Sequence, residues 1–239
     1  MPFYMKILIS IVCFLLMTQL SFAQPGINKD GFGEWEKESQ TNKRLLPRYG
    51  HLPKTEDEIK SDSAFIQQIM SQPQFNTRRE ASSHLIQLGF NYYYRDDLKT
   101  AMYRFNQAYL LDTTNTDIFW GYGAIYMRFG YLGLAADQYE AGLKMDSTNT
   151  HLWTDFATMY LAQYYRLETE ESLDTAIIYF EKSYKLNPKD VNTVYKLSIS
   201  YWNKNDCKNA WKYYDEAVAL GGKPITEAYT SDLKKRCKR

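Results

Sequence analysis

The chain has 239 residues, with 29 Lys and Arg against 28 Asp and Glu and a formal net charge of +1. This balance argues against a nucleic acid or an anionic membrane as the partner, because those partners select strongly basic surfaces. Aromatic side chains make up 16% of the chain, so the interpretation depends on whether these rings pack inside the protein or face a partner.

Residues 1–23 have the pattern of a secretory signal peptide. A basic residue precedes the apolar run from Ile7 to Met17, and the small side chains Ser21 and Ala23 precede a predicted cleavage site. The run is shorter than the roughly 18 residues that a membrane span requires. We therefore predict an exported protein, periplasmic or extracellular and soluble, with no transmembrane segment in the mature chain.

Two further segments precede the repeats. Residues 24–54 contain many turn-forming residues and no sustained period, so we expect them to be extended or disordered. Residues 55–81 are expected to form a leading helix and a linker, because apolar side chains follow an acidic start at helical spacing: Ile59, Phe65, Ile66, Ile69 and Met70. Thr77 and Glu80 form a capping box, which predicts that the first repeat helix begins near Arg78.

From Ser82 the sequence repeats with a period of 34 residues: "FNQAYLLDTTNTDIFWGYGAIY" is echoed by "YEAGLKMDSTNTHLWTDFATMY". The predicted units are 82–115, 116–149, 150–190 and 191–224, the third longer by seven residues. Small residues recur at the eighth position, as Gly89, Gly123, Ala157 and Ser198. They recur again as Ala101, Ala135, Ala176 and Ala210, each followed four residues later by Phe105, Tyr139, Phe180 or Tyr214.

This pattern resembles the tetratricopeptide repeat (TPR). Its signature is matched in the third unit by Trp153, Phe156, Ala157, Tyr160, Ala176, Phe180 and Pro188. The resemblance implies an all-α fold: a right-handed superhelical stack of antiparallel helix hairpins, with an extra N-terminal helix and a C-terminal capping helix over 225–239. The insertion in the third unit either lengthens both helices or forms a protruding acidic loop.

The mature chain would keep two cysteines, Cys207 and Cys237, an even pair in an oxidising compartment. Cys207 begins the second helix of the fourth unit, and Cys237 lies near the end of the capping helix. Because neighbouring helices of the stack run antiparallel, we predict that these thiols meet and form a disulfide. The alternative is two unrelated thiols.

No catalytic constellation emerges. The three histidines, His51, His84 and His151, are far apart in the sequence, and no CxxC, HExxH, GxSxG or P-loop motif occurs. We predict that the protein is not an enzyme and has no catalytic residues, no bound metal and no cofactor.

The candidate functional surface is the concave face, which in TPR relatives is formed mostly by the first helix of each unit. The predicted partner-binding residues are Phe90, Tyr93, Tyr94, Trp120, Met127, Arg128, Tyr195 and Trp202. We expect this surface to be aromatic and nearly uncharged. It lacks the lysine and asparagine clamp with which chaperone-binding relatives hold a terminal carboxylate. A competing interpretation is that the N-terminal segment folds back and fills the groove.

The sequence therefore predicts a non-enzymatic scaffold of the periplasm or cell exterior that binds a protein or peptide partner, and no nucleic acid, through this aromatic face. The alternative is a small-ligand or glycan-binding module that uses the same rings.

Overall fold

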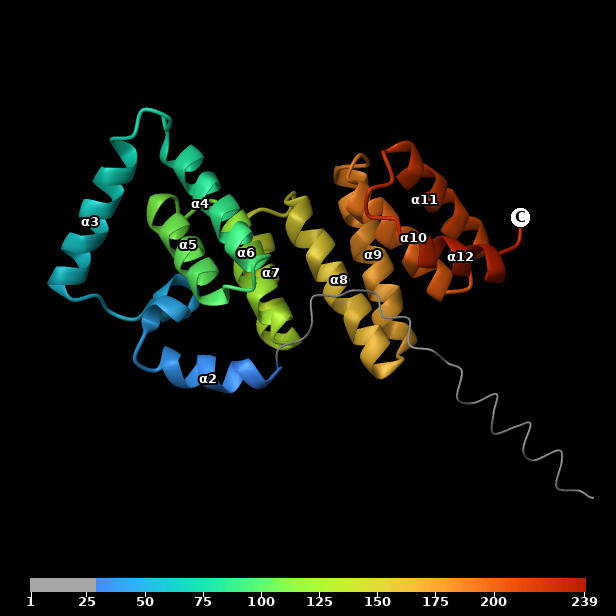
Figure 1. Cartoon of the computed structure of the whole chain (residues 1–239), viewed down its shortest axis with the longest axis horizontal. Coiled ribbons are helices and arrows are strands. Elements are labelled where there is room, and N and C mark those ends of the chain that lie inside the picture. The colour runs from blue at the N-terminus through green and yellow to red at the C-terminus, as the bar shows by residue number, and fades with distance from the viewer. Residues whose placement is uncertain (1–28) are drawn as a thin grey trace, which may run out of the picture.

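The computed structural model describes residues 29–239, and every regular element in that range is helical. The predicted signal peptide lies outside these residues. Four hairpins stack side by side (Figure 1): α4 (Arg78–Tyr93) with α5 (Leu98–Leu111), α6 (Asp117–Arg128) with α7 (Leu132–Met145), α8 (Thr150–Leu167) with α9 (Glu170–Leu186), and α10 (Val191–Asn203) with α11 (Cys207–Ala219). The predicted all-α stack of helix hairpins is confirmed.

The small residues of the repeat lie where paired helices touch. A Cβ atom added to Gly123 would lie 2.1 Å from Cε1 of Tyr139, and one added to Gly89 would lie 2.4 Å from Cε1 of Phe105. The four recurring alanines, Ala101, Ala135, Ala176 and Ala210, are fully buried. The first two hairpins therefore close by placing an aromatic ring against a position that has no side chain.

The insertion of the third unit lengthens its helices. α8 has 18 residues and α9 has 17, compared with 12 in α6 and 14 in α7. Only Glu168 and Thr169 separate α8 from α9, and Glu168 adopts the left-handed conformation that ends α8. There is no protruding acidic loop at this point.

The leading helix is α3 (Glu56–Met70), and capping boxes begin both α3 and α4. Thr55 and Glu58 form the first, and Thr77 and Glu80 form the second, so α4 begins at Arg78 as the sequence predicts. α3 has no fully buried residue and lies at the outer edge of the stack (Figure 1).

The expectation of an extended or disordered segment over 24–54 is wrong for the residues that the structure describes. α2 (Lys29–Ser39) and two 3-10 turns, η1 (Lys43–Leu45) and η2 (Pro47–His51), occupy this region. Phe32 stacks on Tyr131 with ring centroids 3.7 Å apart, and Trp35 meets Phe129 at 5.2 Å. Two rings one helical turn apart gave too short a pattern to reveal this helix. It exists because Tyr126 of α6 and the rings of the turn after α6 offer a surface to pack against.

Asn106 of α5 fastens the rest of this segment to the outside of the first hairpin. Its Oδ1 accepts hydrogen bonds from the Arg48 N–H (2.8 Å) and the Tyr122 hydroxyl (2.7 Å). Its Nδ2 donates to the carbonyls of Arg44 (2.8 Å) and Leu46 (3.0 Å). These bonds compensate for a left-handed run from Arg48 to His51, a conformation that costs roughly 1–2 kcal/mol per non-glycine residue.

The chain ends in α12 (Glu227–Arg236), which lies across α10 and α11 (Figure 1). Cys207 and Cys237 form a disulfide with their Cα atoms 5.2 Å apart, which confirms the predicted pairing. A cross-link over this 30-residue separation stabilises the fold by roughly 3.6 kcal/mol on the chain-entropy model.

Gly123→Ala should destabilise the protein by roughly 1–3 kcal/mol, because its methyl group would overlap the buried Tyr139 ring. Gly133→Ala is the matched control: a Cβ there meets nothing within 4 Å, so stability should stay equal or rise slightly. Urea unfolding followed by circular dichroism measures both. Equal midpoints for the two variants would contradict this account of the hairpin contact.

Asn106→Ala should release the segment around η1 and η2, because it removes all four hydrogen bonds of a buried amide and leaves the Arg48 N–H with its longer bond to the Tyr122 hydroxyl (3.2 Å). The expected loss is roughly 1–3 kcal/mol. Hydrogen exchange of residues 43–52 provides the measurement, with the exposed Asn91→Ala as control. Retained protection of these amides in Asn106→Ala would show that the segment is held by other contacts.

Candidate functional site

A groove with a cavity volume of about 800 Å³ runs across the first helices of the stack. It is lined by side chains of α4, α6, α8 and the N-terminal half of α10, by Leu132 and Tyr139 of α7, and by residues from the turns beside these helices. None of the residues from 29 to 53 lines it. The interpretation that the N-terminal segment fills the groove is therefore wrong for that part of the chain, which packs on α5 and on the turn between α6 and α7 instead.

Six of the eight predicted binding residues line the groove: Phe90, Tyr93, Tyr94, Trp120, Met127 and Arg128. The placement of the other two was wrong. Tyr195 and Trp202 are each only 7% exposed, because α12 covers them and places the Tyr229 ring 5.5 Å from Tyr195 and 6.1 Å from Trp202. The groove therefore ends at Asn192 and Lys196 of α10 and does not include Tyr195 or Trp202.

Trp120 is part of the groove wall and has no free ring face. The centroid of its ring lies 4.0 Å from that of Phe90 on the α4 side. On the α8 side it is stacked on His151, with the ring centroids 4.4 Å apart. Its Nε1 donates a hydrogen bond to Oδ2 of Asp155 at 2.7 Å. Tyr94, by contrast, is 72% exposed, so it is the aromatic ring most accessible to a ligand among the predicted residues.

Charged side chains also line the groove, so the expectation of a nearly uncharged surface was wrong. Asp155 and Lys196 face each other from α8 and α10, with Nζ of Lys196 3.8 Å from Oδ1 of Asp155. Lys196 also donates to the Thr158 hydroxyl at 2.7 Å. Both charged residues occupy the sixth position of their repeat, and this recurrence in neighbouring units was the sequence signal that could have identified them.

The two arginines of the groove differ in their surroundings. The Arg128 guanidinium is mostly buried, pairs with Asp96 at 2.8 Å and lies 5.6 Å from the Tyr93 ring centre. Arg166 lines the groove at the C-terminal end of α8 and is exposed. One arginine is therefore held in place by the protein, and the other is accessible to a ligand.

The tyrosines of the groove remain neutral phenols at ordinary pH. Burial, with the negative charge of Asp155 nearby, raises the pKa of Tyr93 to about 12. Burial likewise raises the pKa of Tyr139 well above its usual value, and its hydroxyl has no hydrogen-bond partner among the described residues. The fixed charges of the groove therefore come from its carboxylates, its lysine and its arginines.

His151 forms a hydrogen bond with Asp117 at the rim, with 3.1 Å between Nδ1 and Oδ1. This bond raises the pKa of His151 above its ordinary value of 6.5, partial burial opposes the shift, and Asp155 and Asp190 add smaller increases. Partial burial raises the pKa of Asp117, but the hydrogen bonds from His151 and Asn149 outweigh it and leave the value lowered.

Over residues 29–239, no group of three or more His, Cys, Asp or Glu side chains is arranged to hold a metal ion. In the same range, no helix combines the length and the apolar character that crossing a membrane would require.

The Asp117 contact gives a pH-dependent prediction. Because the folded-state pKa of His151 is raised, the charged pair stabilises the fold below the unfolded-state pKa of about 6.5, and this contribution disappears as pH rises through the folded-state pKa. Asp117→Asn should therefore cost more stability at pH 5.5 than at pH 8.5, and NMR titration should show a lower His151 pKa. The exposed Asp137→Asn serves as control; an unchanged His151 titration in Asp117→Asn would contradict the assignment.

The sequence matches no protein-family model and no curated protein. Solved structures are similar to parts of this chain. A thermophilic TPR protein of Thermus thermophilus matches with a TM-score of 0.52 and 15% identity, over 58% of this chain and 74% of that chain. MamA matches with a TM-score of 0.47 and 16% identity, over 72% and 98% of the two chains. YrrB, described as a TPR protein with an unusual peptide-binding site, matches with a TM-score of 0.43 and 16% identity, over 78% of this chain and 91% of that chain. The likeness to the Thermus protein, together with the stacked hairpins, shows that this chain has the TPR fold.

Proposed function

We propose that the protein is a non-enzymatic scaffold that holds a segment of another protein in the groove formed by α4, α6, α8 and α10. The observation that carries the proposal is the continuity of the groove, whose lining crosses all four hairpins of a TPR fold. A long open groove suits an extended or helical chain segment, which can contact several repeats at once.

The lining indicates the chemistry of such a segment. Tyr93, Tyr94 and Met127 offer apolar contact area, and the two tyrosines have few rotatable bonds, so they give binding energy at low entropic cost. Asp155 and Lys196 offer an acceptor and a donor side by side in the groove lining, which suits the amide groups of a peptide main chain. We infer a segment with exposed apolar side chains and accessible main-chain amides.

We propose in addition that the protein works outside the cytoplasm. The signal-peptide pattern of residues 1–23 supports export, and the paired cysteines suit an oxidising compartment.

A small-ligand or glycan-binding role is the second candidate, favoured by the cavity volume of about 800 Å³, which is within the usual range of ligand pockets. Stacking of a sugar on Trp120 is disfavoured, because Phe90 and His151 lie against its ring. Tyr94 would have to supply the stacking face.

Tyr94→Ala tests the groove without disturbing the core, whereas Trp120 and Trp202 are packed against neighbouring rings and would make ambiguous probes. A photo-crosslinking side chain at position 94 should capture the partner from cell-envelope extract, and the crosslinked peptide identifies the bound segment. Calorimetry with that segment should then show at least roughly tenfold weaker binding to Tyr94→Ala.

Ile178→Ala is the matched control, since Ile178 is 59% exposed on α9 and does not line the groove. Equal affinity of the Tyr94→Ala and Ile178→Ala variants would refute the groove as the binding surface. Titration with cell-wall glycan fragments tests the second candidate: tight, saturable binding that Tyr94→Ala abolishes would favour it over the protein segment.

A further inference from the structure

The groove stops where α12 covers the fourth repeat. Tyr195 occupies the fifth position of the fourth unit, as Trp120 does in the second unit. Trp202 occupies the twelfth position of the fourth unit, as Tyr93 does in the first. Trp120 and Tyr93 line the groove, whereas Tyr195 and Trp202 lie under Tyr229 of α12. α12 therefore covers the surface onto which the groove would otherwise continue.

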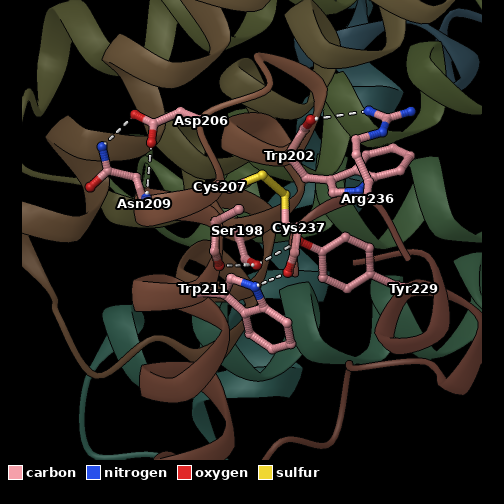
Figure 2. Close-up of a disulfide and its surroundings, with 10 residues drawn as sticks. Ser198, Trp202, Asp206, Cys207, Asn209, Trp211, Tyr229, Arg236 and Cys237 are labelled. Carbon is pink, nitrogen blue, oxygen red and sulfur yellow. Dashed lines mark hydrogen bonds between the residues drawn. A yellow bond between two sulfur atoms is a disulfide. The ribbon is translucent and has the colours of Figure 1, made fainter. Parts of the chain in front are cut away.

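Two buried side chains, together with ring contacts and hydrogen bonds to α10 and α11, hold α12. Within the helix only Tyr229 and Leu233 are buried. Figure 2 shows the surrounding bonds: the Tyr229 hydroxyl meets Ser198 at 2.6 Å, and the Trp211 indole donates to the Cys237 carbonyl at 2.6 Å. Arg236 donates to the Trp202 carbonyl at 3.2 Å and lies 3.7 Å from the Trp202 ring centre. A helix of 10 residues has little stability of its own, since isolated helices below about 12–15 residues are marginal in water.

The disulfide ties this short helix down at its end. Cys207 is the first residue of α11, and Cys237 caps the C-terminus of α12. Without the covalent bond, α12 would keep its two buried side chains, the ring contacts of Tyr229 and Arg236, and the hydrogen bonds of Tyr229, Thr230 and Arg236.

We propose that the Cys207–Cys237 disulfide is a redox-sensitive latch, and that its reduction by a dithiol releases α12 and uncovers Tyr195 and Trp202. Cys207 is partly exposed and Cys237 is buried, so a thiolate of the reductant attacks the Cys207 sulfur and Cys237 leaves as a thiolate that takes up a proton. The second thiol of the reductant then attacks the mixed disulfide, which forms the cyclic disulfide of the reductant and frees Cys207. Two electrons pass from the dithiol to the protein.

Hydrogen exchange of the α12 amides tests the latch, in a full chain that carries Cys13→Ser so that only two cysteines remain. Addition of dithiothreitol should accelerate exchange over residues 227–236 by up to roughly 400-fold, the value expected for losing a cross-link over 30 residues. Exchange in α4 to α9 should stay unchanged, which shows that the stack remains folded. Unchanged α12 exchange after complete reduction would overturn the proposal.

A second measurement asks whether the covered rings become accessible. In Cys207→Ser/Cys237→Ser, hydroxyl-radical labelling of Trp202 should rise several-fold, while labelling of Trp153, buried in α8, should match the wild type. Arg236→Gln removes a contact with Trp202 but keeps the disulfide, so its α12 amides should stay protected. If Trp202 labelling does not change in the serine variant, or if Arg236→Gln alone opens α12 to the same extent, the disulfide is not the latch. Neither readout requires the groove partner.

Discussion

The contact on which the rest of the structure depends is the close approach of two helices at a position without a side chain. Gly123 against Tyr139 and Gly89 against Phe105 are its clearest cases. The ring occupies the space that a Cβ atom would need, so each hairpin closes at a fixed distance and angle. A closed hairpin still has an apolar face to bury, and the next hairpin buries it. Repetition of this contact sets the first helices side by side and creates the groove.

The groove combines rings held by the scaffold with a smaller number of accessible groups. Trp120 is fixed between Phe90 and His151 and held by Asp155. Tyr94 and Arg166 are exposed at the groove surface. Such a division suits recognition, because a prearranged wall loses little conformational entropy when a ligand binds and the accessible groups supply the new contacts.

Segments outside the repeats decide how much of the stack is open. The residues from α2 to η2 fasten to α5 and to the α6–α7 turn, away from the groove, through Asn106 and the ring of Phe32. At the other end, α12 covers Tyr195 and Trp202 and so limits the groove to its present length. The same repeat position is thus a groove wall in one unit and a buried core in another.

The amino-acid sequence by itself determined the hairpin stack, the start of α4 and the pairing of Cys207 with Cys237, because a 34-residue period, a capping box and an even cysteine count are local or repeating patterns. The tertiary structure alone decided that Phe32 and Trp35 anchor a helix, that the insertion extends α8 and α9, that Asp155 and Lys196 meet in the groove, and that α12 buries Tyr195 and Trp202. Periodicity reports which face of a helix its neighbouring repeats bury. It carries no information about which non-repeating segment packs on the remaining faces, since that depends on contacts between residues far apart in the chain.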